Sequence, residues 1–254
     1  MQVQFIRNAT LLLQVAGKTI LVDPLLAPQG QYDPAPMSDN NRRIPLVDLP
    51  FPAAELPEWL RTVDAVLITH THPDHWDALA QELLDKQLPL LCQPADTKLL
   101  QEQGFTQVLP IKDELEWEGI QFYRTTGQHG TGEIGVLMGT VSGFVMEAEQ
   151  ARLYIAGDTI WCDDVREALT RYQPTNVMVN AGAARFTMGD PITMTAADVI
   201  QTAQFAPQAS VYAVHLEAVN HASENRAQVR ALAAQEGLSN RVFVPNDGEW
   251  ITLA

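Results

Sequence analysis

The sequence has few cysteines and few basic residues for its 254 positions. Two cysteines, Cys92 and Cys162, are too few for a disulfide framework, which favours a reducing compartment. Lysine and arginine number 16 against 31 aspartates and glutamates, which leaves a formal net charge of −15. Such a charge repels a phosphate backbone and an anionic membrane surface. We therefore expect a small-molecule substrate and no nucleic-acid partner.

Long apolar runs are missing as well. No stretch approaches the ~20 apolar residues that span a bilayer, so we expect no integral membrane association. The apolar runs of residues 1–22 are broken by Arg7, Asn8 and Gln14, a pattern typical of strands and not of a secretion signal. We expect a cytoplasmic protein. The sequence is compatible with a homo-oligomer but does not indicate one.

The length suits a single domain over residues 1–254. Apolar periodicity predicts strands at residues 3–6, 11–15, 19–22, 63–69, 88–92, 107–109, 153–156, 176–179, 211–214, 242–244 and 250–253. Residues 114–146 are predicted to be mainly β, with a glycine-rich loop at 127–139. Helices are predicted at residues 77–86, 95–103, 163–172, 195–205 and 222–235. The proline-rich segment 23–57 has neither the helical nor the strand periodicity of apolar residues. It is either a functional loop or a surface excursion.

The order of these elements predicts an α/β fold. A β-rich and then a mixed β/α region occur twice, which favours two sheets packed face to face with helices outside. A parallel Rossmann sheet is the competing interpretation, and it needs a glycine-rich phosphate loop after the first strand. The first predicted hairpin contains only Gly17, so this alternative is weak.

The strongest chemical signal is the segment THTHPDHWD at residues 69–77. Residues two apart in an extended segment point to the same side, so His70 and His72 can reach one cation. Pro73 turns the chain, after which Asp74 and His75 can face a second cation. Imidazole nitrogens and carboxylate oxygens suit Zn²⁺ and related ions. A polar surface turn is the plainer interpretation, but an apolar strand that ends in histidines has no simple packing explanation.

The pattern His-x-His-x-Asp-His at residues 70–75 resembles the signature of the metallo-β-lactamase superfamily at every defined position. That superfamily continues with a histidine, an aspartate and a histidine, and His129, Asp158 and His215 stand here in that order. The resemblance implies a four-layer αββα sandwich of two mixed β-sheets flanked by helices. It implies two divalent metal ions, Zn or Mn, held by His70, His72, Asp74, His75, His129, Asp158 and His215.

In the superfamily's arrangement, one metal takes His70, His72 and His129, the other takes Asp74, His75 and His215, and Asp158 bridges the two. Each of the three later matches has a simpler interpretation when taken alone. His129 is then an exposed polar residue in a glycine-rich loop, Asp158 a helix cap, and His215 a buried core histidine.

The resemblance also implies the chemistry. Two metals can hold a bridging hydroxide that attacks a carbonyl carbon or a phosphorus, with Asp74 and Asp158 as catalytic residues. His221, six residues after His215, is a candidate proton donor to the leaving group, or alternatively the start of the helix predicted from residue 222.

Two short elements suggest a branch of the superfamily. Asn8-Ala9-Thr10 and Val22-Asp23-Pro24 resemble elements of the group that contains ascorbate-6-phosphate lactonase and N-acyl-phosphatidylethanolamine phospholipase D. Asn8 stands where that group commonly has histidine. We therefore expect hydrolysis of a small ester, lactone or phosphodiester. The alternatives are a metal-dependent oxidoreductase or thioester hydrolase on the same ligands, and a catalytically inactive metal-binding or sensing protein.

Overall fold

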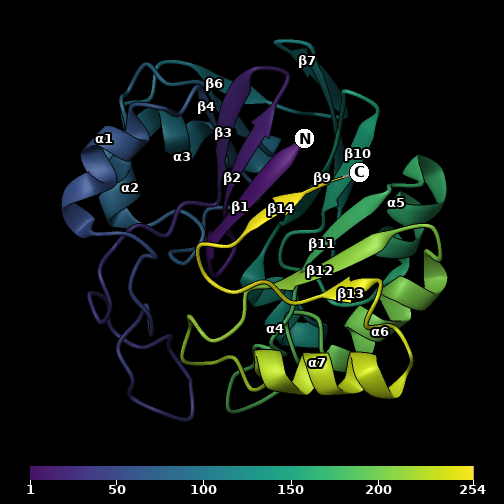
Figure 1. Cartoon of the computed structure of the whole chain (residues 1–254). Coiled ribbons are helices and arrows are strands. Elements are labelled where there is room, and N and C mark those ends of the chain that lie inside the picture. Colours follow the sequence, from purple (N-terminus) through teal and green to yellow (C-terminus); the bar gives the residue numbers. More distant parts are fainter. Residues whose placement is uncertain (254) are drawn as a thin grey trace.

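The structure, a computed structural model, describes residues 1–253 and contains two seven-stranded sheets (Figure 1). The strands are β1 (Gln2–Arg7), β2 (Thr10–Val15), β3 (Lys18–Val22), β4 (Ala65–Ile68), β5 (Leu90–Cys92), β6 (Val108–Pro110), β7 (Glu114–Trp117), β8 (Ile120–Thr126), β9 (Ser142–Ala148), β10 (Ala151–Ile155), β11 (Asn176–Asn180), β12 (Ser210–Val214), β13 (Val242–Phe243) and β14 (Trp250–Thr252). The helices are α1 (Leu56–Leu60), α2 (Ala78–Leu83), α3 (Thr97–Glu102), α4 (Gly132–Met138), α5 (Asp163–Tyr172), α6 (Ala196–Phe205) and α7 (Arg226–Gln235), with 3₁₀ turns η1 (Ala53–Glu55) and η2 (Pro94–Asp96).

Both sheets are mixed, as predicted. The first has the order β14-β1-β2-β3-β4-β5-β6, with antiparallel pairs up to β3 and parallel pairs from β3 to β6. The second has the order β13-β12-β11-β10-β9-β8-β7, with parallel pairs as far as β10 and antiparallel pairs beyond it. The two halves of the chain thus repeat one strand pattern.

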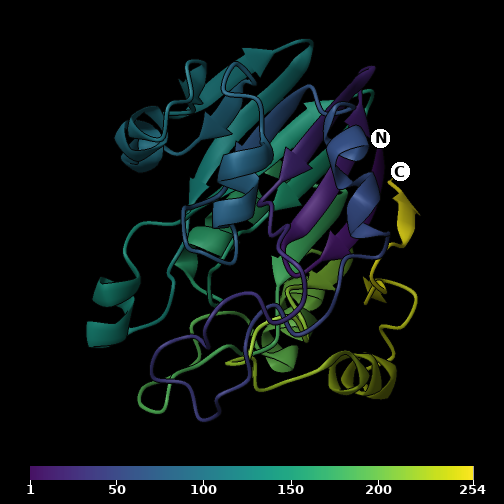
Figure 2. The same ribbon diagram turned by 90° about the vertical axis from the view of Figure 1, so that its left-hand side faces the viewer.

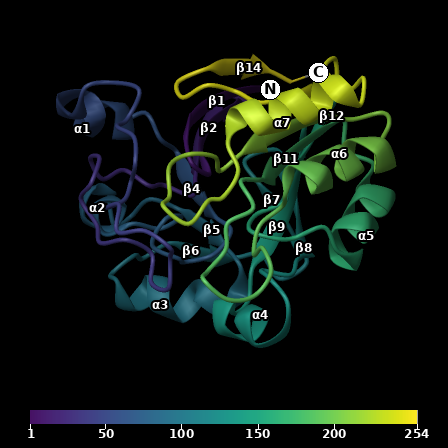
Figure 3. The ribbon, with the colours of Figure 1, turned by 90° about the horizontal axis from the view of Figure 1, so that it is seen from below.

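The layers are held together by apolar clusters. Phe5 and Leu13 of the first sheet share a buried cluster with Phe122, Phe144 and Met178 of the second, so the inner faces pack on each other. Helices α1, α2 and α3 cover the outer face of the first sheet, and α5, α6 and α7 cover that of the second (Figures 1 and 3). The predicted αββα sandwich is confirmed.

Three element predictions were wrong. The glycine-rich loop predicted at 127–139 contains helix α4, which stands away from both sheets in Figure 2, where it is teal. The predicted irregular segment 23–57 ends in η1 and the start of α1. The helix predicted from residue 222 begins at Arg226, because the Asn225 side chain accepts from Gln228 N and closes a capping box. Among residues 1–253, every helix is too short or too polar to cross a membrane.

Candidate metal centre

The residues predicted to bind metal follow the carboxyl ends of strands. His70 comes after β4, His129 after β8, Asp158 after β10 and His215 after β12. Strands β8, β10 and β12 run in one direction in their sheet, so their carboxyl ends meet at one edge. Gly157 makes the approach of Asp158 possible, since its φ is +68° and a Cβ there would lie 2.6 Å from Ser142 O.

The first group of donors consists of His70, His72 and His129, whose ligand atoms all lie within 4.8 Å of one another. His70 Nε2 and His72 Nδ1 are 3.0 Å apart. This is the pair that the alternation of an extended segment predicts to face one side. His129 arrives from the other sheet and completes a cluster of three imidazoles.

The second group consists of Asp74, His75, Asp158 and His215, also within 4.8 Å of one another. His215 Nε2 lies 3.1 Å from Asp74 Oδ2, and His75 Nε2 lies 3.3 Å from Asp158 Oδ1. The other oxygen of Asp158, Oδ2, lies 3.5 Å from His129 Nε2 of the first group. The carboxylate of Asp158 therefore stands between the two groups.

Hydrogen bonds outside the two groups orient the imidazoles. Asp23 is buried and its Oδ2 accepts from His75 Nδ1 at 2.8 Å and from the Thr69 hydroxyl at 2.6 Å. Because that hydroxyl gives its proton to Asp23, its oxygen accepts from His70 Nδ1 at 3.0 Å. His129 Nδ1 donates to Ile192 O at 2.8 Å. In His70, His75 and His129 the Nε2 atom is thus the one turned toward the centre.

Asn8 forms hydrogen bonds with two members of the second group, Asp74 and His215. Its Nδ2 donates to Asp74 O at 3.0 Å, and its backbone oxygen accepts from His215 N at 2.7 Å. Asn8 and His215 both have left-handed backbones, with φ of 52° and 62°. Such conformations cost free energy in residues other than glycine and concentrate at functional sites. In the sequence, Asn8 and Asp23 are marked only by two short family elements and, for Asn8, by a break in an apolar run, so neither is predicted to support the centre.

The electrostatics of the two groups differ. Burial and the neighbouring His75 lower the pKa of His70 well below 6.5, so its ring is neutral. Burial also lowers the pKa of His75, but Asp158, Asp74 and Asp23 outweigh it and raise that pKa well above 6.5. Burial raises the pKa of Asp158, but His75 and His215 together bring it well below 3.8. The second group is therefore a cluster of ionised carboxylates and imidazolium rings.

This donor set fits divalent metal ions. Three oriented imidazoles form one site, and two imidazoles with two carboxylates form another, which suits Zn²⁺ and Mn²⁺. His75 Nε2 is buried between carboxylates and has no hydrogen-bond partner among the described residues, and a metal ion that displaced its proton would use the lone pair.

Comparison with known proteins agrees with this geometry. The family model described as beta-lactamase superfamily domain matches residues 18–216, a span that contains both groups of donors. The chain belongs to the metallo-β-lactamase superfamily. The chain is 37% identical to the UPF0173 protein YddR of Bacillus subtilis, with 100% of each chain covered. It is 26% identical to a UPF0173 metal-dependent hydrolase of Methanospirillum hungatei, over 79% of this chain and 78% of the relative.

A solved structure gives the same relationship. The isothiocyanate hydrolase from Delia radicum gut bacteria has a TM-score of 0.93 and 37% sequence identity, with 100% of both chains covered. Relatives named as hydrolases support an enzyme of that class for this metallo-β-lactamase superfamily member.

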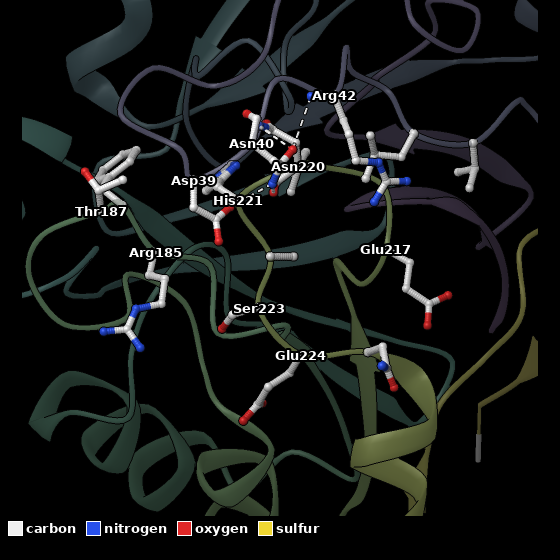
Figure 4. A pocket seen from close by; sticks show the side chains of 16 residues that line it. Asp39, Asn40, Arg42, Arg185, Thr187, Glu217, Asn220, His221, Ser223 and Glu224 are labelled. Atoms are coloured by element: carbon white, nitrogen blue, oxygen red, sulfur yellow. Dashed lines mark hydrogen bonds between the residues drawn. The ribbon is translucent and has the colours of Figure 1, made fainter.

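His221 lies outside both donor groups. It lines a pocket of about 950 Å³ formed by loops near residues 39–47, 185–187 and 217–225, where Figure 4 shows it beside Asn220 and Asn40. Its ring stacks on Phe186 with centroids 5.9 Å apart, and burial lowers its pKa. His221 is not the start of a helix, which was the alternative interpretation, since α7 begins at Arg226.

The proline-rich segment forms one wall of this pocket. Asn220 Oδ1 accepts from Ala35 N at 2.9 Å, and Asn220 Nδ2 donates to Ser38 Oγ at 2.7 Å. Asn40 Nδ2 donates to Asn220 O at 2.8 Å. Residues 35–40 are thus fastened to the loop that carries His215 and His221.

Proposed function

We propose that the protein is a dinuclear metal-dependent hydrolase of a small ester, lactone or phosphodiester. The observation that carries the proposal is the position of Asp158, with one oxygen toward His129 of the first group and the other toward His75 and His215 of the second. Two divalent ions in such a site supply a hydroxide at neutral pH and neutralise negative charge that develops on the substrate.

The side chains have separable roles in this proposal. Asp74 and Asp158 stay ionised and are held in place by neighbouring imidazoles. His221 is neutral at pH 7, because burial lowers its pKa, and we assign it a ring N–H that hydrogen-bonds to the leaving group in the adjoining pocket. The alternative of a protein that only binds or senses metal keeps both ions and lacks turnover.

The test is elemental analysis of the purified protein together with kinetics on lactones, phosphodiesters and simple esters. We expect two equivalents of metal and turnover. The variant Asp158→Asn should lower kcat by at least about 10²-fold, because it removes the charge that joins the two groups. Two equivalents of metal without turnover on any substrate would favour the sensing protein, and full hydrolysis by a metal-free Asp158→Asn variant would contradict the mechanism.

A second candidate substrate class is the isothiocyanates, favoured by the 37% identical isothiocyanate hydrolase. The central carbon of R–N=C=S is electrophilic, and addition of water followed by C–N cleavage gives R–NH₂ and COS. Exposed apolar side chains on α4, which begins three residues after His129, and on the loop facing α4 favour such neutral substrates. Val136 and Leu137 of α4 are 83% and 61% exposed, and Met188 is 71% exposed on the loop that packs against α4.

The same kinetic panel separates the two classes of substrate. A kcat/KM for an alkyl or aryl isothiocyanate that exceeds every lactone and phosphodiester would select the isothiocyanate class. The reverse order would select the ester, lactone or phosphodiester class. Amine release gives a direct readout of the isothiocyanate reaction.

A further inference from the structure

Asn180, the last residue of β11, contacts the carboxylate that stands between the two donor groups. Its Nδ2 lies 2.6 Å from Asp158 Oδ1, and both side chains are buried, with 3% exposure each. The sequence offers no motif around Asn180, whose 22-residue separation from Asp158 is closed only by the fold.

The orientation of the amide follows from its partner. The oxygens of Asp158 lie among the Nε2 atoms of three imidazoles, those of His75, His129 and His215, and a carboxylate in such surroundings only accepts hydrogen bonds. The amide of Asn180 must then present its NH₂ group, because the opposite orientation would place two acceptors 2.6 Å apart. A charge-assisted bond of this length is among the stronger hydrogen bonds in proteins.

The sheet fixes where Asn180 stands. Strand β11 pairs in parallel with β10, which leads to Asp158, and with β12, which leads to His215. Asn180 is in register with Val214, the residue before His215, and its carbonyl accepts from Met194 N at 3.1 Å. Asn180 therefore comes from the strand between two strands that deliver members of the second group.

The two oxygens of Asp158 have different surroundings. Oδ1 faces His75 Nε2 at 3.3 Å and His215 Nε2 at 3.8 Å, whereas Oδ2 faces His129 Nε2 at 3.5 Å. Asn180 donates to Oδ1, and this hydrogen bond opposes rotation of the carboxylate about its Cβ–Cγ bond. It also occupies one of the acceptor positions of Oδ1 and leaves the rest for the second group.

We propose that Asn180 is a positioning residue that holds the Asp158 carboxylate between the two donor groups, with Oδ1 turned to the second and Oδ2 to the first. This inference rests on the proposed dinuclear site. Asn180 adds no imidazole or carboxylate to either donor group, and in this proposal it acts through its hydrogen bond to Asp158. Partners of this kind typically change metal affinity by about 10–100-fold when they are removed.

The test uses two variants of Asn180. Asn180→Leu keeps the side-chain volume and removes the N–H donor, and Asn180→Ala removes the side chain beyond Cβ. Asn176→Ala is the matched control. Asn176 lies on the same strand with 2% exposure, about 13 Å away along the strand. Metal affinity is measured by competition with a chromogenic chelator. The visible spectrum of the cobalt(II)-loaded protein reports the geometry of the site, and urea unfolding of the metal-free proteins reports stability.

Both Asn180 variants should bind Zn²⁺ about 10–100-fold more weakly and change the cobalt(II) spectrum, whereas Asn176→Ala should lose stability with wild-type affinity and spectrum. Wild-type affinity and spectrum in folded Asn180→Leu would overturn the positioning role and leave the dinuclear hydrolase intact. Two metals in the wild type without turnover would instead overturn the proposed function, while the affinities still test Asn180. Failure of the wild type to bind metal would overturn both.

Discussion

Single residues outside the donor groups decide how well the centre is formed. Asp23 illustrates this, because its carboxylate accepts from Thr69 N at 2.8 Å as well as from the Thr69 hydroxyl and His75 Nδ1. One buried side chain thereby fixes the start of the motif segment and, through Thr69, the ring of His70. Loss of this carboxylate leaves several buried donors without an acceptor.

The variant Asp23→Ala is expected to lose about 3–5 kcal/mol of unfolding free energy and about 10–100-fold in metal affinity. Urea unfolding and chelator competition measure the two effects. Asp64→Ala is a suitable control, since Asp64 also accepts from a backbone N–H, that of Thr19, but is exposed. Equal metal affinity in wild type and a folded Asp23→Ala variant would contradict the orienting role of Asp23.

The spacing of residues in the sequence predicts the side chains of the metal-binding motif. It does not predict the side chains that hydrogen-bond to them. His70, His72 and the other predicted donors, which the structure places in two groups, could be proposed from the sequence because a strand, a turn and a fixed order of residue types mark them. Asn180 could not be found, since its contact depends on the register between β10 and β11. The distinction is physical: local geometry follows from neighbouring residues, whereas a hydrogen bond between strands requires the packed sheet.

At the scale of elements, the helix predicted at 163–172 agrees with α5, which has no side-chain cap, so a correct prediction does not require a capping signal. The predicted helix 195–205 agrees with α6, whose cap Thr195 and Asp198 close a capping box. The start of α7 was wrong because the equivalent pair, Asn225 and Gln228, was overlooked. Helix α4 has no side-chain cap and contains glycine, so its sequence resembles a loop; contacts of Ile134 and Met138 with the segment 184–192 stabilise it instead.

Gly135 of α4 provides a test of that element. Alanine ordinarily stabilises a helix relative to glycine by about 1 kcal/mol. Here a Cβ would lie 2.8 Å from the backbone oxygen of Gly130, the residue after His129, so either α4 or the His129 loop must move. We expect Gly135→Ala to be destabilised and to bind metal more weakly, as measured by thermal unfolding and chelator competition.

Val136→Ala is the control for helix propensity in α4, because Val136 is exposed and a Cβ already exists there. It should leave metal affinity unchanged. An increase in the melting temperature of Gly135→Ala, together with wild-type metal affinity, would show that the contact between α4 and the His129 loop does not matter.

For the whole molecule, the centre joins the two halves of the sandwich. His70, His72, Asp74 and His75 follow the first sheet, whereas His129, Asp158 and His215 follow strands of the second. The repeated order of β-rich and mixed regions predicted the two sheets from sequence, but the way their edges meet depends on the shared apolar core. A metal ion bound by ligands from both halves stabilises the folded state by mass action.

That stabilisation should depend on pH. In the metal-free protein the pKa of His75 is raised, so its favourable ion pairs are fully present below 6.5 and are lost as the pH rises through the raised value. The pKa values of Asp74 and Asp158 are lowered, so their contribution is present above 3.8 and is lost as the pH falls through the lowered values. The second group of the metal-free centre therefore contributes most between 3.8 and 6.5, whereas the buried neutral His70, whose pKa is lowered, loses stability as the pH falls below 6.5.

A bound cation takes the place of the protons on His75 and His215, so metal affinity rises with pH by about 1.4 kcal/mol per pH unit for each proton displaced. The difference in unfolding free energy between metal-loaded and chelator-treated protein should accordingly widen as the pH of the measurement is raised from acidic to mildly alkaline values, until the displaced protons have left the metal-free protein as well. Urea unfolding of both forms at matched ionic strength measures it. The Asp23→Ala variant removes one of the carboxylates that raise the pKa of His75, so its difference should level off at lower pH than in the wild type. A difference that stays constant over the whole range would mean that the metal displaces no imidazole proton, and His75 and His215 would then not be its ligands.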